Sequence, residues 1–400
     1  MKLGIFFLVL AYMLSQFYRA FLAVLEPVLF TDLGARPDDL ATASGLWFLA
    51  FAAMQIPIGW SLDKIGPRIT ASGLLAIGGA GGAFLFSVAQ APIHINIAMV
   101  LIGVGCAPVL MASYYIFARS FSTAVFSTLA SATVGIGAVG NIASSLPMTW
   151  AAEVFGWRET VLYVAVLTLL IAAAMFFLVK DPVKPEHEKL VKGSVLDLLK
   201  IKALWLIFPM MFVNYAAVAG IRGLWISPYL NDVFAANAAA VGNATLIMAV
   251  AMAIGSFVYG PLDRIFKTRK WVVIIGNFAG FSALMALLIF PASSYALSVV
   301  LLAAIGLFAA SFAVLVAHAR SFIPAHLTGR GVTLLNLFGI GGAGIMQALS
   351  GRVHGAALVG ATNTAQPYQA LFLFFGISLL TGMLVYLFSQ DRMNYSPKTH

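Results

Sequence analysis

Apolar segments of about 20 residues follow one another along the whole chain, with short polar connections between them. A helix of this length crosses the roughly 30 Å hydrocarbon core of a bilayer. Membrane β-strands need only about 10 residues and alternate polar with apolar positions, which these segments do not. The pattern therefore predicts an all-α integral membrane protein with twelve transmembrane helices. We expect these helices at residues 4–30, 41–60, 69–88, 95–118, 124–149, 160–179, 204–230, 238–259, 271–290, 296–317, 331–350 and 368–389.

The composition excludes a soluble protein. Hydrophobic residues make up 62% of the 400 positions and charged residues 9%, whereas soluble domains carry about 25% charged residues. Cys106 is the only cysteine, which excludes an intrachain disulfide and a cysteine metal cluster. We attribute the net charge of +9 to the basic cytoplasmic side of a membrane protein and not to nucleic-acid binding.

The distribution of charge predicts the topology. With the N-terminus in the cytoplasm, the cytoplasmic ends and loops hold 18 basic and 7 acidic residues, and the periplasmic loops hold three basic and six acidic ones. The positive-inside rule therefore places both termini in the cytoplasm of a bacterial cell with the chain in the inner membrane. The first segment starts directly after Lys2 and has no small-residue cleavage site, so we expect an uncleaved helix.

One long polar stretch divides the chain. Residues 180–202, KDPVKPEHEKLVKGSVLDLLKIK, are too charged to enter the bilayer and too short to form a domain. We expect a cytoplasmic linker there, between an N-terminal six-helix bundle at 1–179 and a C-terminal six-helix bundle that begins at 203 and runs to residue 400.

The two halves share short sequences at an offset of about 200 residues, which predicts two pseudo-symmetric bundles with a site at their interface, as in many secondary transporters. The matches are ARSF at 118–121 and 319–322, Asp63-Lys64-Ile65 and Asp263-Arg264-Ile265, Pro27 and Pro228, and GIGAVG at 135–140 with GIGGAG at 339–344.

Three motifs give the chain a resemblance to the major facilitator superfamily. GWSLDKIGPR at 59–68 is similar to the Gly-x-x-x-Asp-Arg/Lys-x-Gly-x-Arg signature between helices two and three of that superfamily. YGPLDRIFKTRK at 259–270 is a degenerate copy, in which Phe266 replaces the second glycine. FGWRETVLYV at 155–164 is typical of the junction between helices five and six. The resemblance implies a secondary transporter that works by alternating access.

Charged residues at the cytoplasmic helix ends predict a gate. An acid on the basic side of the membrane is unusual, and it can pair with a basic residue or cap the N-terminus of a neighbouring helix. We expect such a gate from Asp63, Arg68 and Arg119 in the first half and from Asp263 and Arg320 in the second half.

Arg19, Glu26 and Arg222 lie inside apolar segments. A central arginine costs about 2.5–3.5 kcal/mol to insert, so we expect it to face a cavity and to serve function. Arg19 and Arg222 lie eight and six residues before Pro27 and Pro228, which places both guanidinium groups near one central site. Two such groups suit a carboxylate or a phosphate, which each can bind through two hydrogen bonds.

FYRAFLAVLEPVLFTDLG at 17–34 resembles the first helix of organic-phosphate antiporters and organic-anion symporters. That resemblance implies that arginines of helices one and seven hold the anion. The spacing of six in helix seven departs from this pattern.

Glu26 follows Arg19 by seven residues and lies on the same helix face, about 10 Å nearer the periplasm. A carboxyl group in a semi-dry cavity exchanges protons, which predicts proton coupling at Glu26. The alternative is a helix-end acid in contact with periplasmic water. Further polar residues at mid-depth are expected to contact substrate: Tyr18, Tyr115, Asn141, Asn214, Trp225 and Asn336.

The sequence thus predicts a monomeric transporter of a small organic anion, driven by an ion or proton gradient and working without a cofactor or a resident metal. It contains no nucleotide-binding loop and no hydrolase motif, which argues against an enzyme. Two alternatives stay open. One is a drug or metabolite exporter, although the GP-x-x-GG element is missing; the other is a copper importer that uses Met248, Met252 and His318.

Overall fold

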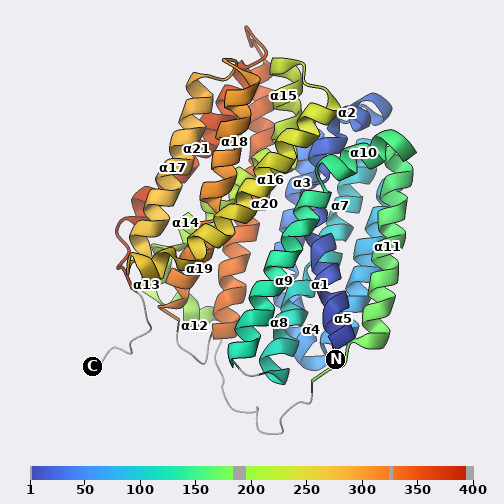
Figure 1. Cartoon of the computed structure of the whole chain (residues 1–400), viewed down its shortest axis with the longest axis vertical. Helices are drawn as coiled ribbons and strands as arrows, with labels where there is room; N and C mark the ends of the chain where they lie inside the picture. Colours follow the sequence, from blue (N-terminus) through green and yellow to red (C-terminus); the bar gives the residue numbers. More distant parts are fainter. Residues whose placement is uncertain (1, 122, 183–194, 324–327, 393–400) are drawn as a thin grey trace. The chain divides into compact units, whose positions relative to one another are not determined.

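The computed structural model describes residues 2–121, 123–182, 195–323 and 328–392, and Figure 1 shows the course of the chain. Every regular element in these ranges is a helix. The helices up to residue 178 are α1 (Lys2–Phe17), α2 (Leu22–Leu33), α3 (Pro37–Ala53), α4 (Gln55–Lys64), α5 (Pro67–Leu74), the π-helix η1 (Leu75–Ala80), α6 (Gly81–Ser87), α7 (Pro92–Cys106), α8 (Pro108–Ser120), α9 (Thr123–Ala143), α10 (Leu146–Phe155) and α11 (Trp157–Leu178).

The remaining helices begin after the second gap in the described ranges. They are α12 (Val195–Leu199), α13 (Lys202–Trp205), α14 (Phe208–Gly220), the π-helix η2 (Ile221–Trp225), α15 (Ile226–Phe234), α16 (Ala238–Ile265), α17 (Lys270–Ile289), α18 (Tyr295–Ala309), α19 (Phe312–Arg320), α20 (Thr328–Leu358) and α21 (Gln366–Tyr386).

Ten helical segments among the described residues are long and apolar enough to cross a membrane. The pair α1 and α2, which bends by 53° at a short break, makes an eleventh. The remaining expected segment, 124–149, is occupied by α9 and the start of α10, with a shorter apolar stretch at Ala132–Ala143. These helices confirm the all-α membrane fold that the apolar pattern predicts.

The contacts divide the chain into two compact units. Unit 1 comprises the described residues of Met1–Pro185 together with Arg222–Asn231 and Ala236–Leu246. Unit 2 comprises the described residues of Glu186–Ile221, Asp232–Ala235 and Ile247–His400. The segment Arg222–Asn231, from the second half of the sequence, is therefore part of the contact network of unit 1.

Within unit 1, α1 packs on α9, α3 on α7, and α11 on α6 and η1; α1 and α9 run side by side in Figure 1. Within unit 2, α14 packs on α20 and α21, and α17 on α18 and α21. Thus α1, in the first sequence half, and α14, in the second, each pack against the helix that carries the glycine-rich repeat, α9 or α20.

Small residues allow these helix pairs to approach closely. A Cβ atom at Gly140 of α9 would lie 1.9 Å from the carbonyl oxygen of Met13 in α1, and one at Gly342 of α20 would lie 2.1 Å from that of Phe212 in α14. Both distances are far below van der Waals contact, so each helix pair depends on its glycine. Lipid offers no hydrophobic driving force between helices, and close backbone packing takes its place.

We expect Gly140→Ala to lower the stability of the protein by roughly 1–3 kcal/mol, because the new methyl group forces α1 and α9 apart. The measurement is the melting temperature of purified protein in detergent. Gly135→Ala is the matched control on the same helix, since a Cβ atom there meets nothing within 4 Å. Replacing a glycine by alanine at an exposed helix position stabilises a protein by roughly 0.5–1 kcal/mol. We therefore expect Gly135→Ala to raise the melting temperature and Gly140→Ala to lower it. A control that melts as low as Gly140→Ala would contradict the close-packing account.

Candidate functional site

Arg19 lies in the break between α1 and α2, where the chain bends. Its guanidinium carbon is 5.3 Å from the ring centroid of Trp47 and 5.1 Å from that of Phe51, both on α3. Among the described residues, no acceptor is within hydrogen-bonding distance of its buried Nε atom. Aromatic faces stabilise the cation, but they leave that N–H donor unsatisfied. A carboxylate or phosphate oxygen would satisfy it.

Arg222 lies in the π-helix η2, and only 3% of its surface is exposed. Nη1 donates to the side-chain oxygen of Asn141 at 3.2 Å, and Nη2 donates to the backbone oxygen of the same residue. The hydroxyl oxygens of Ser144 and Ser145 each lie 3.4 Å from Nη2. The structure therefore joins two of the predicted substrate-binding residues, Arg222 and Asn141, directly to each other within unit 1.

Glu26 is buried in α2, with 7% of its surface exposed. The hydroxyl of Ser227 donates a 3.3 Å hydrogen bond to its carboxylate. Each of these residues directly precedes a proline of the internal repeat, Pro27 or Pro228. Repeat-equivalent positions of the two sequence halves thus contact each other inside unit 1.

Three other predicted contact residues take part in interactions of their own. Tyr18 is fully buried and shares a 2.8 Å hydrogen bond with Thr168 of α11. The guanidinium of Arg119 lies over the ring of Tyr115 on α8, 4.4 Å from the ring centroid. Trp225 is buried next to Arg222 in η2, with 1% of its surface exposed. Tyr18 and Tyr115 thus contribute to packing within unit 1.

The remaining two lie in unit 2. Asn214 of α14 donates to the side-chain oxygen of Asn277 at 2.6 Å and to the hydroxyl of Ser311 at 3.1 Å. Both amides line a small cavity between α14, α17 and α18. Asn336 is half-buried on α20. Asn214 belongs to unit 2, whereas Arg222 and Asn141 belong to unit 1.

In the first sequence half, the expected gate residues lie at helix ends. Asp63 is in α4, but its side chain lies outside the described part of the structure. The backbone N–H of Arg68, at the start of α5, donates to Asp181 at 2.8 Å, and its Nε lies 3.7 Å from the same carboxylate. Asp181 follows the end of α11, so this contact ties two helix ends together within unit 1.

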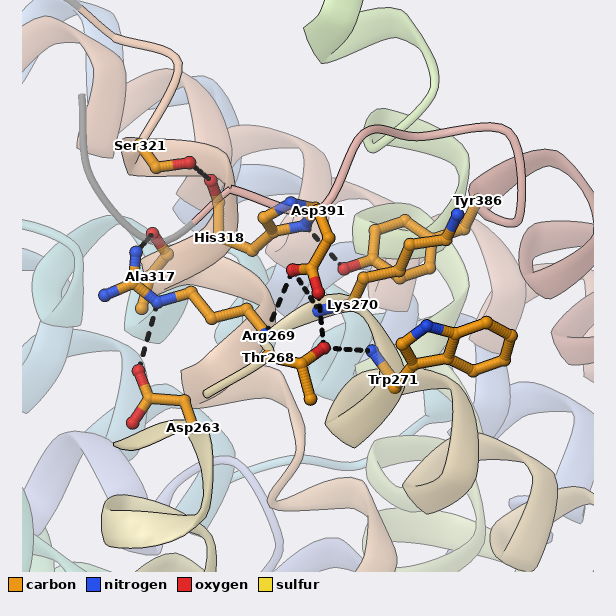
Figure 2. Close-up of polar contacts among 10 residues, drawn as sticks. All are labelled: Asp263, Thr268, Arg269, Lys270, Trp271, Ala317, His318, Ser321, Tyr386 and Asp391. Carbon is orange, nitrogen blue, oxygen red and sulfur yellow. Dashed lines mark hydrogen bonds and ion pairs between the residues drawn. The ribbon is translucent and has the colours of Figure 1, made fainter. Parts of the chain in front are cut away.

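Figure 2 shows the corresponding region of unit 2. The Nε atom of Arg269 donates to the carboxylate of Asp263 at 3.0 Å, and its Nη1 donates to the backbone oxygen of Ala317 at 3.2 Å. Arg320, at the end of α19, is exposed. Asp263 therefore has a basic partner close in sequence, which the repeat pattern did not predict.

Asp391 is a further structural residue that the sequence analysis missed. Its carboxylate accepts the hydroxyl of Thr268 and the backbone N–H groups of Arg269 at 3.2 Å and Lys270 at 3.1 Å (Figure 2). Burial acts to raise the pKa of the Asp391 carboxyl, but these hydrogen bonds outweigh it, so the pKa lies below its usual value. Asp391 follows α21 in the same way that Asp181 follows α11. This recurrence of an acid after the last helix of each half is the feature of the sequence that indicates Asp391.

The residues of the copper alternative are engaged in packing and hydrogen bonds. A Cβ atom at Gly306 of α18 would lie within 3.2 Å of the side chains of Met248 and Met252. The ring nitrogens of His318 lie 2.6 Å from the hydroxyl of Tyr386 and 2.9 Å from the backbone oxygen of Gln390. Among the described residues, no group of three or more His, Cys, Asp or Glu side chains is placed to hold a metal ion.

These observations define a multi-pass helical membrane protein with an internal repeat and buried charges. The Major Facilitator Superfamily profile matches residues 8–221 and 207–399, and the chain belongs to this superfamily. It is therefore a secondary transporter of a small solute and not an enzyme. A search of curated protein sequences found no significant match.

Several solved structures share the fold. The D-xylose–proton symporter has a TM-score of 0.76 at 14% identity, with 97% of each chain covered. The nucleoside transporter NupG has a TM-score of 0.73 at 15% identity, with 97% of this chain and 98% of its own covered. A bacterial homologue of the human lysosomal transporter Spinster, in an inward-facing and occupied conformation, has a TM-score of 0.70 at 18% identity, with 96% and 94% covered.

We expect Asp391→Asn to lower the melting temperature at neutral pH, because the neutral amide is a weaker acceptor for Thr268 and the two N–H groups. A carboxylate whose pKa is lowered by folding contributes stability above its ordinary pKa, and this contribution is lost as the pH falls through the pKa of the folded state. The difference between wild type and variant should therefore be constant above about pH 5 and shrink below about pH 4. Melting curves at a series of pH values measure it, and a difference independent of pH would contradict this role.

Proposed function

We propose that this transporter carries a small organic anion, a carboxylate or a phosphate ester, across the bacterial inner membrane, and that Arg19 binds the anionic group. The observation that supports the proposal is the environment of Arg19. A full positive charge lies at a break in a membrane-spanning helix pair, held over two aromatic rings. Its Nε–H has no acceptor among the described residues.

A neutral solute would offer this N–H donor no charged acceptor. A carboxylate or a phosphate offers two oxygen atoms to the planar guanidinium, which gives short, charge-assisted hydrogen bonds. Breaks in membrane helices are also where secondary transporters bind their substrates, because backbone groups become available there. Arg222, which is buried whereas Arg19 is half-buried, lies in a π-helical turn, an irregularity that is frequent at functional sites.

We further propose that Glu26 couples transport to protons. Its carboxyl group is buried beside a hydroxyl, and ionisable groups inside membrane segments commonly take part in proton relays. The proposal includes cytoplasmic termini, a monomeric state and the division into bundles at 1–179 and 203–400. It also includes a cytoplasmic gate formed by Asp63, Arg68, Arg119, Asp263 and Arg320.

The first test is uptake into proteoliposomes of labelled glycerol 3-phosphate, inorganic phosphate, succinate and lactate, with D-xylose and uridine as uncharged comparisons. We expect saturable uptake of at least one anion and none of the uncharged solutes. Arg19→Lys keeps the charge but loses the planar fork, and uptake should fall roughly 10- to 100-fold.

Arg36→Lys is the matched control, because Arg36 is an exposed arginine shortly after the end of α2. It should leave uptake unchanged. Uptake of D-xylose or uridine in preference to every anion would overturn the proposal, and wild-type uptake by Arg19→Lys would remove Arg19 from the binding site.

The second test concerns Glu26. We expect Glu26→Gln to abolish accumulation driven by a pH gradient, because the amide does not release a proton, and to retain exchange of labelled for unlabelled anion. Glu153→Gln changes an exposed acid of α10 and should behave as wild type. Gradient-driven accumulation that persists in Glu26→Gln would assign coupling to another group.

A further inference from the structure

The end of α9 presents a group of oxygen acceptors. The helix ends at Ala143, and Ser144 and Ser145 separate it from α10, which carries Pro147 in its first turn. A proline has no N–H group with which to continue the hydrogen bonds of α9. The N–H of Ser145 donates to the backbone oxygen of Ile142 at 3.1 Å and not to that of Asn141. The break therefore releases the backbone oxygen of Asn141 from the regular helical pattern.

Other groups use the released oxygen. The hydroxyls of Ser144 and Ser145 donate to it at 2.9 and 3.2 Å, and Nη2 of Arg222 donates to it as well. The amide oxygen of Asn141 accepts Nη1 at 3.2 Å. Neutral oxygens at a helix C-terminus, the negative end of the helix dipole, favour a cation. We name these four oxygens, from Asn141, Ser144 and Ser145, the arginine cradle.

The segment that carries Arg222 is held by a second polar contact. Ser227 lies five residues further along and donates to Glu26 at 3.3 Å. All residues from Ile221 to Leu230 are buried. Arg222 itself lies in η2, between two regular helices. A π-helical turn joins residue i to residue i+5 by a hydrogen bond, and so interrupts the α-helical pattern between the two flanking helices.

We propose that the arginine cradle and the anionic substrate compete for the guanidinium of Arg222. This inference rests on the proposed function and extends it to selectivity. In the docked state, the cradle holds Arg222 and the segment Arg222–Asn231. Substrate binding withdraws the guanidinium from the cradle and releases the segment.

The competition selects for charge. The cradle offers neutral acceptors only, so a carboxylate or phosphate, which forms charge-assisted hydrogen bonds of about twice the strength, displaces it. A sugar or nucleoside offers neutral hydroxyls and does not. The docked state also lowers the apparent affinity of the anion, because only the undocked fraction binds it. Weakening the cradle must therefore tighten binding, whereas loss of a direct substrate contact would weaken it.

Substitutions at Asn141 give effects of opposite sign. Asn141→Ala removes one acceptor, and we expect the Kd for glycerol 3-phosphate to fall roughly 3- to 10-fold. Asn141→Asp adds a negative charge beside Arg222 and should raise the Kd by at least a similar factor. Ser144→Ala tests the cradle without changing Asn141 and should act in the same direction as Asn141→Ala. Asn96→Ala and Asn96→Asp on α7 are the controls, since Asn96 is a half-buried asparagine of unit 1 outside the cradle.

A second readout needs no substrate. Leu230→Cys, at a fully buried position of the segment, should react with an aqueous maleimide faster when combined with Asn141→Ala and more slowly with Asn141→Asp. The native Cys106 is buried and is replaced by serine in this background. If the labelling rates change in these directions but the wild-type protein binds no anion, the cradle holds the segment Arg222–Asn231 and the proposed function is wrong. A Kd that rises in both Asn141 variants, or labelling that changes in neither, would overturn the competition.

Discussion

A guanidinium group inside a membrane-spanning segment has to be held by other groups of the protein, and this constraint applies twice in the chain. Charge in a hydrocarbon environment is expensive unless aromatic faces, hydrogen bonds or water compensate it. Arg19 is compensated by the rings of Trp47 and Phe51. Arg222 is compensated by the oxygens at the end of α9. The two arginines are near-equivalent in the sequence repeat, yet the structure compensates them by different means.

The difference has a local origin. Around Arg19 the helix is interrupted and bends by 53° between α1 and α2. Around Arg222 the helix continues through the π-turn η2 without such a break. The wider hydrogen-bond spacing of a π-turn changes the direction of the side chains that follow. The unequal distances to Pro27 and Pro228, eight and six residues, accompany this difference in helix geometry.

The two units also share a device at the helix ends. An acid after the last helix of each sequence half, Asp181 or Asp391, accepts the backbone N–H groups at the start of α5 or α17. A carboxylate at a helix N-terminus satisfies donors that have no partner within the helix and opposes the positive end of the dipole. In unit 2 the neighbouring Arg269 also binds Asp263, so the second copy of the loop motif forms a closed local network (Figure 2).

The sequence by itself determined the class of fold. The length and apolarity of the segments require membrane helices, and the repeated motifs require two related halves. Segment length, apolarity and repeated motifs can all be read from the order of the residues, without knowledge of which residues are in contact. It also singled out Arg19, Glu26 and Arg222, since a charge in an apolar segment is visible without any structure. What each of these charges contacts was decided by tertiary structure. The helix break ahead of Pro147 frees the backbone oxygen of Asn141, and only packing brings Arg222 to it from 81 residues away. Likewise, the sequence analysis expected both Asn141 and Asn214 to contact substrate, but Asn214 hydrogen-bonds Asn277 and Ser311 in unit 2. Side chains on a helix that is apolar on all faces carry no periodic signal for direction, so their partners follow from how the helices pack.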